Sequence, residues 1–378
     1  NSHPMIPFNK PFLTGKETFY IEEAVKSGKI SGNGIYTQKC QAFFEEHYGF
    51  KKALLTTSCT DALEMSALLI DCAQEDEIIV PSYTFVSTAL AFVRQGAKIV
   101  FVDSQIDNPN LDVSKLEQLI TSKTKAIIVV HYAGSAVDMD VVMQLAHKYN
   151  LIVIEDAAQA IDSYYKGKPL GSIGHLAAFS FHETKNVISG EGGLLAINDS
   201  KYVDRAEIIW EKGTNRASFF RGEINKYSWV DTGSSFLPSE IIAAFLWAQL
   251  ENLTAIQTKR KVIWNTYYNA FQNLEKQQKL KLPQIPYYAS NNAHMFYLVC
   301  DSLATRSALI SYLKEQNIHA VFHYLSLHKS DFYLKYNDAA TLPNSDYFSD
   351  RLVRLPFYYD LKIEEQQKII QAILEFYA

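Results

Sequence analysis

Short apolar runs that alternate with helical patterns are the feature that most constrains the fold of this chain. The run at residues 151–154, Leu-Ile-Val-Ile, is bounded by polar residues, and similar runs stand at 177–181 and 194–197. Such a run is typical of a parallel strand buried on both faces. Further strands are expected at 53–55, 77–80, 98–102 and 126–130, with helices near 84–95, 112–120 and 138–149. This alternation predicts an α/β fold with a large, mostly parallel sheet and helices on both faces.

The length of 378 residues favours two domains over a single core. We expect a large domain over residues 5–254 and a smaller C-terminal α/β domain over residues 255–378, because the composition changes after the helical pattern at 239–253. The smaller domain should contain a helix at 259–272, strands near 294–299 and 320–323, and helices at 307–316 and 363–377. Residues 1–4, Asn-Ser-His-Pro, precede Met5 and are expected to be a cloning remnant.

Composition and charge exclude several classes of function. A net charge of -5 without a run of Lys or Arg gives no basic surface for nucleic acid or for a membrane. The sequence has no stretch of eighteen apolar residues, so no transmembrane helix is expected. The four cysteines have no Cys-x-x-Cys spacing, so we expect free thiols in a reducing cytoplasm and no metal site.

A carboxylate and a lysine follow two consecutive predicted strands. Asp156 comes directly after the strand at 151–154, and Lys185 follows the strand at 177–181. The chemistry of open α/β sheets is found past the carboxyl ends of such strands. A fixed carboxylate keeps the ring nitrogen of pyridoxal phosphate (PLP) protonated, and a desolvated lysine attacks its carbonyl. Either residue alone would be ordinary, Asp156 as a helix N-cap and Lys185 as a solvated loop residue.

Asp156 and Lys185 indicate PLP only if the chain also provides a site for the phosphate group of PLP. The segment after the strand at 53–55 is suited to such a site. It leads into Ser58 and Thr60 at the start of a helical pattern, where free backbone N–H groups and the helix dipole attract anions. Helix capping, with Asp61 and Glu64 as a pair, is the favoured reading of these residues alone, and the two roles are compatible. Tyr83 follows another strand and could stack on a flat cofactor, although its position alone favours an ordinary buried aromatic residue.

Three spaced motifs carry a resemblance to a known family. They are Glu155-Asp156-Ala157-Ala158-Gln159, Ser180-Phe181-His182-x-x-Lys185 and Gly190-Glu191-Gly192-Gly193. In order and spacing they resemble the DegT-like PLP-dependent sugar aminotransferases of fold type I, over the whole chain from Met5. The resemblance implies that catalytic Lys185 forms the Schiff base with PLP, that Asp156 pairs with the pyridine nitrogen and that Gln159 lies near the ring hydroxyl. It also implies a stacking role for Tyr83, phosphate contacts from Ser58, Thr60 and Ser180, and Cys59 as a further cofactor-binding residue.

One departure from the family pattern concerns the segment 233–237, Gly-Ser-Ser-Phe-Leu. In the family that this chain resembles, the segment usually reads Gly-x-Asn-x-Arg, and its Asn reaches the cofactor phosphate of the neighbouring subunit. Ser235 takes the Asn position and Leu237 the Arg position. The resemblance implies a homodimer with shared active sites. A hydroxyl can still donate to phosphate, so we expect Ser235 to be a cofactor contact.

The resemblance is closer to one subgroup, through segments 81–88, 131–134, 181–186, 211–216 and 292–297. It implies transfer of the amino group of L-glutamate to C4 of dTDP-4-keto-6-deoxyglucose, for surface polysaccharides such as lipopolysaccharide O-antigen or enterobacterial common antigen. Tyr324 and His328 are candidates for substrate contact, and ordinary packing explains them equally well. Amination to the gluco epimer or at C3 stays open. PLP-dependent sugar dehydratases resemble this chain with His in place of Lys185, which argues against that reaction.

Overall fold

The computed structural model describes residues 4–378, and a seven-stranded sheet forms its centre. The strand order is β1-β9-β8-β5-β4-β2-β3. The strands are β1 (Lys52–Thr56), β2 (Glu77–Pro81), β3 (Lys98–Val102), β4 (Thr124–Val130), β5 (Ile152–Asp156), β8 (Leu176–Ser180) and β9 (Gly193–Ile197). Only β9 runs antiparallel to its neighbours in this sheet. The predicted α/β fold with a mostly parallel sheet is therefore confirmed.

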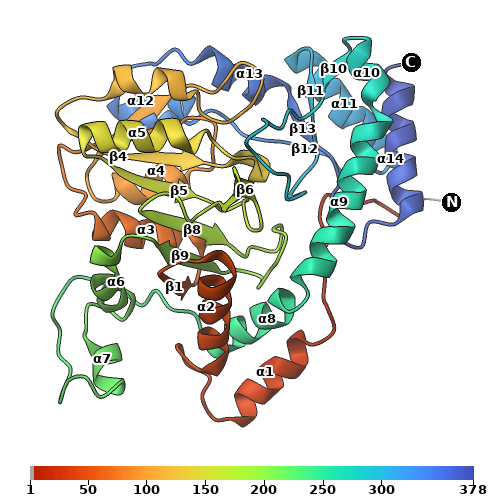
Figure 1. Cartoon of the computed structure of the whole chain (residues 1–378). Helices are drawn as coiled ribbons and strands as arrows, with labels where there is room; N and C mark the ends of the chain where they lie inside the picture. The colour runs from red at the N-terminus through yellow and green to blue at the C-terminus, as the bar shows by residue number, and fades with distance from the viewer. Residues whose placement is uncertain (1–3) are drawn as a thin grey trace.

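Alternate residues of each strand pack against helices on opposite faces of the sheet. In β4, Ile127 and Val129 join a core with α2 (Ile35–Tyr48), α5 (Met139–Tyr149) and α8 (Glu240–Leu250). Ala126 and Ile128 join the other core. That second face is covered by α3 (Cys59–Leu69), α4 (Ser87–Val93) and α6 (Val203–Trp210), and Figure 1 shows α2 and α3 on either side of the sheet ribbon. Burial on both faces explains why these strands are continuous apolar runs.

A buried carboxylate fixes the start of α2. Glu240 is 1% exposed, and it accepts hydrogen bonds from the backbone N–H groups of Gly34, Tyr36 and Thr37 at 2.9, 2.8 and 3.0 Å. These are N–H groups that a helix N-terminus leaves without intrahelical partners. A Cβ on Gly34 would lie 2.5 Å from the Glu240 side chain, so glycine is required there.

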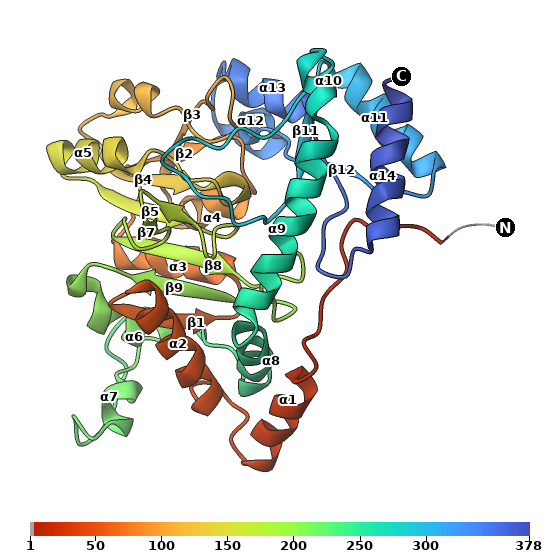
Figure 2. The ribbon, with the colours of Figure 1, turned by 45° about the vertical axis from the view of Figure 1, so that its right-hand side comes forward.

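A smaller antiparallel sheet, in the order β10-β11-β13-β12, forms the second layered unit. Its strands are β10 (Leu280–Lys281), β11 (Tyr297–Cys300), β12 (Val321–Phe322) and β13 (Leu352–Arg354). The helices of this part are α9 (Leu253–Ala270), α10 (Gln272–Lys276), α11 (Leu303–Glu315), α12 (Asp331–Tyr336), α13 (Pro343–Arg351) and α14 (Ile363–Phe376). Figure 2 shows α9 running from the large sheet to the small one, beside α14. The expected domain division at residues 254 and 255 falls in the first turn of α9 and stays an interpretation.

Several predicted boundaries differ from the structure. Two 3-10 turns, Val113–Lys115 and Glu117–Leu119, replace the helix expected at 112–120. The helix expected at 84–95 is the short α4. The strand expected at 294–299 begins only at Tyr297, and in the segment before it Arg260 donates to the carbonyls of Ala293 and His294. The predicted remnant at residues 1–4 lies, except for Pro4, outside the described residues.

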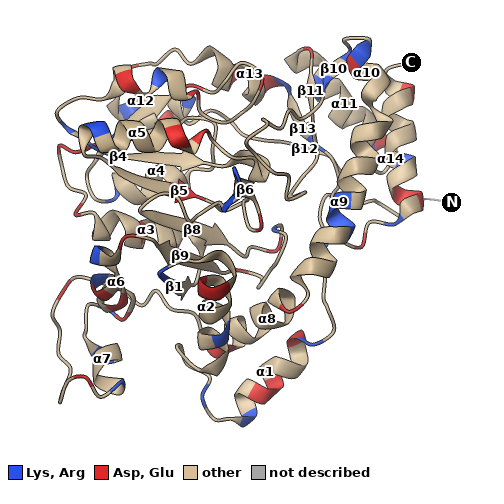
Figure 3. Cartoon of the chain, viewed as in Figure 1, with Lys and Arg blue, Asp and Glu red and all other residues tan. Residues whose placement is uncertain are grey.

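The remaining elements lie at the margins of the large sheet. They are α1 (Glu17–Lys26), the hairpin strands β6 (Tyr164–Tyr165) and β7 (Lys168–Pro169), α7 (Arg216–Phe220), and short 3-10 turns at Tyr132–Gly134, Ser200–Tyr202 and Leu327–Lys329. Lys and Arg alternate with Asp and Glu over the ribbon in Figure 3. Across residues 4–378, no helix is both long and apolar enough to cross a bilayer. The same residues contain no group of three or more His, Cys, Asp or Glu side chains placed to hold a metal ion.

Candidate active site

A cavity of about 720 Å³ lies past the carboxyl ends of β1, β5 and β8. One wall comes from the segments after these strands and from the start of α4. Its other wall comes from His323 and Tyr324 after β12 and from Arg354 at the end of β13. The predicted site residues that line it are Ser58, Cys59, Thr60, Asp156, Gln159, Ser180, Lys185 and Tyr324. Segments far apart in the sequence therefore meet here because parallel strands end at one edge.

Asp156 is the last residue of β5 and is only 6% exposed. Its Oδ2 accepts a hydrogen bond from Thr88 Oγ1 at 2.7 Å, and its Oδ1 accepts one from the Ala158 N–H at 3.1 Å. Burial raises the pKa of this carboxyl group, and these two hydrogen bonds oppose the shift. A cationic group in the cavity would favour the ionised carboxylate further. Two fixed donors also hold the carboxylate in one orientation.

Lys185 lies in the loop between β8 and β9 and lines the same cavity. Burial, followed by the positive charge of Arg354, lowers the pKa of Lys185 to about 8, and the Asp156 carboxylate opposes this. A lysine amine is nucleophilic only when it is neutral. The cavity therefore holds a lysine that is prepared to attack a carbonyl, together with a fixed carboxylate.

Backbone and hydroxyl donors gather where β1 meets α3. Ser58 is the N-cap of α3, and its Oγ accepts a hydrogen bond from the Asp61 N–H at 3.0 Å, so the predicted capping is confirmed at Ser58. The predicted pair of Asp61 and Glu64 is not formed, since Asp61 accepts from Thr57 and Glu64 pairs with Arg94. Thr60 Oγ1 lies 2.7 Å from Ser87 Oγ. Gly193 of β9 packs against this turn so closely that a Cβ would lie 2.3 Å from the Ser58 carbonyl carbon. A helix N-terminus with hydroxyl groups on its rim is suited to an anion such as a phosphate.

Gln159 links the two walls of the cavity. Its Oε1 accepts a hydrogen bond from the Ala133 N–H at 2.6 Å, and its Nε2 donates to the Tyr324 hydroxyl at 3.1 Å. Asn292 donates to the Gln159 carbonyl at 2.8 Å and so fixes the backbone beneath it. The Gln159 amide is held by partners on both sides, so its orientation is set before any ligand binds.

Comparison with known proteins agrees with this geometry. Residues 12–374 match the DegT/DnrJ/EryC1/StrS aminotransferase family. The chain belongs to this family. The spore coat polysaccharide biosynthesis protein SpsC of Bacillus subtilis is 32% identical over 378 residues, which are 97% of this chain and 96% of that protein.

Two solved structures are similar over nearly the whole aminotransferase. The putative sugar aminotransferase Spr1654 of Streptococcus pneumoniae, in its PMP form, superposes with a TM-score of 0.91 at 26% identity and covers 98% of both chains. Helicobacter pylori PseC, an aminotransferase involved in the biosynthesis of pseudoaminic acid, has a TM-score of 0.90 at 25% identity and covers 98% of this chain and 99% of that one. The chain is thus a PLP-dependent sugar aminotransferase.

The residues of the cavity fit PLP group by group. The cofactor needs an anion site for its phosphate, a carboxylate for its ring nitrogen and a lysine for its aldehyde. The start of α3, Asp156 and Lys185 supply these in one cavity. Gly193 gives the space at the phosphate end, because any side chain there would strike the Ser58–Cys59 peptide. The individual roles of these residues remain predictions of the sequence and the geometry.

The structure corrects the prediction for Tyr83. This side chain is 1% exposed, packs in a cluster with Tyr132, Met295 and Phe348, and does not line the aminotransferase cavity. Phe85, two residues later, lines the cavity and is 57% exposed. The segment is a turn, so strand alternation does not tell which of the two aromatic rings faces the cofactor. Phe85 is therefore the better candidate for stacking.

Two other predicted residues lie outside this cavity. His328 is 1% exposed, its Nδ1 is 2.7 Å from Ser82 Oγ, and its Nε2 is 3.3 Å from Asp346 Oδ1. In place of the predicted substrate contact, His328 packs the 3-10 turn Leu327–Lys329 against the loop after β2 and against α13. Ser235 is exposed and lines a different cavity, with Gly32 and Lys212. It does not line the cofactor cavity of its own chain, and its contact with a neighbouring subunit stays a prediction.

The sequence reasoning missed Thr88, Phe85, His323 and Arg354. A signal existed for the first two, because Ser87 and Thr88 place hydroxyl groups at the start of α4 and Phe85 precedes them. His323 and Arg354 come from the small sheet, and no local pattern relates them to Lys185.

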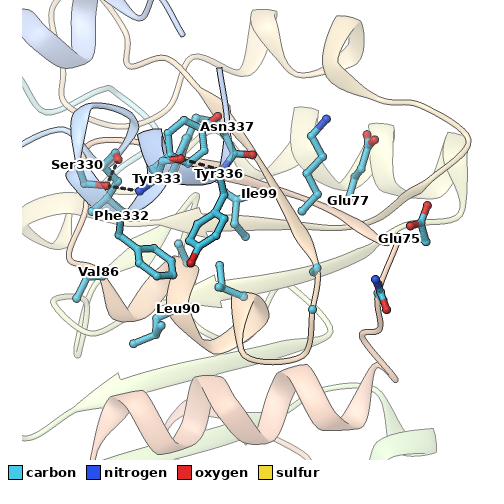
Figure 4. A pocket seen from close by; sticks show the side chains of 18 of the residues that line it. Glu75, Glu77, Val86, Leu90, Ile99, Ser330, Phe332, Tyr333, Tyr336 and Asn337 are labelled. Carbon is cyan, nitrogen blue, oxygen red and sulfur yellow. Dashed lines mark hydrogen bonds between the residues drawn. The ribbon is translucent and has the colours of Figure 1, made fainter. Parts of the chain in front are cut away.

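A second cavity of about 550 Å³ lies along the edge strand β3, between α4 and α12. Figure 4 shows Phe332 and Tyr336 of α12 on one side of it, with Val86 and Leu90 facing them and Glu75 and Glu77 at the far end. None of the predicted site residues lines this cavity. It is separate from the aminotransferase site.

Proposed function

We propose that this aminotransferase transfers the amino group of L-glutamate to C4 of dTDP-4-keto-6-deoxy-D-glucose. The products are dTDP-4-amino-4,6-dideoxy-D-galactose and 2-oxoglutarate, and the amino sugar enters a surface polysaccharide. The observation that carries the proposal is the shared cavity of Asp156 and Lys185, with the pKa of Lys185 lowered to about 8. The substrate rests on the resemblance of segments such as 81–88 and 211–216. The names of SpsC and PseC support a role in surface or acidic sugars.

The chemistry divides between the cofactor and the chain. When bound, PLP supplies a ring that stabilises negative charge on the carbon next to the amine. Lys185 Nζ removes the proton from Cα of glutamate and, in the second half-reaction, delivers a proton to C4 of the sugar. Asp156, whose carboxylate is held by Thr88 and Ala158, would pair with the ring nitrogen of PLP and keep it protonated. The face from which Lys185 approaches C4 decides between the galacto and gluco products.

A homodimer with shared sites is part of this proposal. The segment 211–235, which we call the arm, contains α7 and extends away from the sheet in Figure 1. It carries Phe220 at 65% and Trp229 at 83% exposure, which is unusual for large apolar side chains. Ser235 lies at the base of the arm. A second copy of the chain would cover these rings and receive Ser235 at its cofactor phosphate. Sedimentation of the wild type and of Trp229→Ser tests this, because a monomeric wild type contradicts it.

The free cysteines support a cytoplasmic location for the enzyme, which is part of this proposal. The four cysteines are unpaired, and Cys40, Cys72 and Cys300 are buried. This usage favours the reducing cytoplasm, where glutamate and nucleotide sugars meet the enzyme.

The decisive experiment is incubation of the PLP-loaded enzyme with dTDP-4-keto-6-deoxyglucose and L-glutamate. NMR then assigns the position and configuration of the new amino carbon. An equatorial C4 amine would identify the gluco epimer, and a C3 amine would identify a 3-aminotransferase acting on an isomerised substrate. Lys185→Ala should remove turnover while the fold, measured by circular dichroism, is retained. Turnover by this variant would refute the role of Lys185.

A further inference from the structure

Two threonine hydroxyl groups form a chain that ends on the Asp156 carboxylate. Thr88 Oγ1 donates to Asp156 Oδ2 at 2.7 Å, and Thr84 Oγ1 lies 2.9 Å from Thr88 Oγ1. A hydroxyl group has one proton to donate, and the proton of Thr88 goes to the carboxylate. Thr84 is therefore the donor to Thr88, and both bonds of the chain point toward Asp156. Both threonines line the cofactor cavity, although Thr84 is only 2% and Thr88 only 1% exposed.

The backbone around both threonines is held by hydrogen bonds of its own. Thr84 lies in the turn after β2, where its N–H donates to the Ser82 carbonyl at 3.0 Å. Ser82 Oγ in turn accepts a hydrogen bond from the His328 N–H at 3.0 Å. Thr88 lies in the first turn of α4, and its N–H donates to the Phe85 carbonyl at 3.2 Å. The two hydroxyl groups therefore stand in fixed positions, and each bond of such a chain polarises and strengthens the next.

The other groups around Asp156 do not replace the hydroxyl chain. Within residues 4–378, the only second donor to this side chain is the Ala158 N–H, which bonds to Oδ1. The titratable groups that act on the carboxyl group or are acted on by it are Lys185, His131, Cys59 and Tyr324. Burial raises the pKa of the cysteine and of the tyrosine, so both are neutral. The histidine ring bonds to Glu155 at 2.9 Å instead, and the lysine acts only through its charge.

Asp156 needs the hydroxyl chain because burial acts against its negative charge. Burial raises the pKa of its carboxyl group, and the hydrogen bond from Thr88 is the largest effect that opposes the rise. A hydrogen bond to an ionised carboxylate is stronger than one to a neutral group, so the chain stabilises the carboxylate more than the protonated acid. The carboxylate is the form that keeps the ring nitrogen of PLP protonated.

We propose that Thr88, oriented by Thr84, is a positioning residue that keeps Asp156 ionised beside the cofactor ring. This inference rests on the role proposed above for Asp156 at the ring nitrogen. The nitrogen and the carboxylate share one proton, and the hydroxyl chain favours the arrangement in which the nitrogen holds it. Without the chain, the carboxyl group holds the proton more tightly, and the unprotonated ring withdraws electrons less strongly.

Titration of Asp156 in the full-length apoprotein is the direct test. Carbon-13 NMR of the carboxyl groups follows the titration, and comparison with Asp156→Asn identifies the signal. Thr88→Val removes the hydroxyl group and keeps the side-chain volume, so it should raise the proton affinity of Asp156 about tenfold, a rise of about one pH unit in the midpoint. Thr88→Ser keeps the hydroxyl group and should titrate as the wild type does.

Two further variants locate the effect. Thr84→Val should raise the proton affinity of Asp156 by a smaller factor, about two- to threefold, because it weakens the chain one bond away from the carboxylate. Thr266→Val is the matched control, since the Thr266 hydroxyl donates to the Val262 carbonyl at 2.8 Å within α9. It should titrate as the wild type does.

A second measurement uses the loaded protein and PLP labelled with nitrogen-15 in its ring. The ring signal should move toward that of the unprotonated nitrogen in Thr88→Val and stay at the wild-type position in Thr88→Ser. An unchanged midpoint of Asp156 in Thr88→Val, an equal rise in Thr88→Ser, or an unmoved ring signal would each overturn the proposal. If Thr88→Val does not fold, Thr84→Val decides, and a wild-type midpoint in that variant refutes the chain. Failure of the wild type to aminate the ketosugar would refute the proposed function instead, and it would leave the titration unaffected.

Discussion

The lowered pKa of Lys185 predicts the pH at which the apoprotein captures PLP. The shift from 10.5 to about 8 arises first from burial and then from the Arg354 charge. At pH 7 about a tenth of a lysine with a pKa of 8 is neutral, against roughly three parts in ten thousand for an ordinary lysine. Attack on the cofactor aldehyde should therefore be faster by about two orders of magnitude than at an exposed lysine.

The assay mixes apoprotein with PLP and follows the visible band that appears on covalent attachment to the protein. The rate should rise about tenfold per pH unit below pH 8 and level off above it, because only the neutral amine reacts. Lys185→Ala should give no band. Arg354→Met should move the levelling point to higher pH, because a neighbouring positive charge is removed. A wild-type rate that continues to rise to about pH 10 would refute the reasoning.

The same shift gives a signed prediction for stability. Between about pH 8 and 10.5, the unfolded chain holds the Lys185 proton and the folded apoprotein does not. The free energy of unfolding should therefore increase with pH across this window, relative to Lys185→Met, by at most about 3 kcal/mol. Urea denaturation of both apoproteins at the two ends of the window measures this difference. A relative stability that falls with pH would contradict the assignment.

Three substitutions test the surroundings of the site. Phe85→Ala should weaken PLP binding about three- to tenfold without loss of stability, whereas Tyr83→Ala should cost about 3 kcal/mol of unfolding free energy, because only the Tyr83 ring is buried. Equal effects of the two substitutions on both measurements would contradict a stacking role for Phe85. Glu240→Gln should destabilise the fold by about 2–4 kcal/mol in urea, since three backbone donors lose a carboxylate, and a change below about 0.5 kcal/mol would show that these bonds are weak. Gly193→Ala should lower PLP affinity in equilibrium dialysis by at least about tenfold, because the alanine Cβ would lie 2.3 Å from the Ser58 carbonyl carbon. Unchanged affinity would show that the turn before α3 can move to accommodate the Cβ.

Patterns with a local physical cause were readable from the sequence. The strand expected at 98–102 has those limits in the structure, because a run buried on both faces needs apolar residues throughout. Asp156, Lys185 and Ser58 were found because each follows a strand, and parallel strands end at one edge. The helix expected at 112–120 did not form, although Asp112 caps its start through the Ser114 N–H at 3.0 Å. The N–H groups of Lys115 and Leu116 bond to carbonyls three residues back, which makes the segment two 3-10 turns.

The direction of side chains within turns could not be predicted from the sequence. Tyr83 and Phe85 are both aromatic, both follow β2 and both suit stacking by composition. Only the turn between β2 and α4 decides which ring enters the core and which faces the cavity. Arg354 was missed for another reason, since an arginine at the end of a short apolar strand is typical of a solvated sheet edge. Its partners are set by tertiary packing, which the strand pattern does not contain.

The reacting end of the cavity depends on how the two sheets are joined, and that junction is built around the neighbour of Lys185. Asn186 donates from Nδ2 to Gln257 of α9 and to the Asn292 carbonyl, both at 2.8 Å, while its Oδ1 lies 2.9 Å from His294 Nδ1. These partners belong to the helix that links the sheets and to the segment leading into β11. The loop that carries Lys185 is thus tied directly to the small sheet that carries Arg354. Because buried polar networks with every partner present resist rearrangement, the separation of the amine and the guanidinium is fixed before a donor binds.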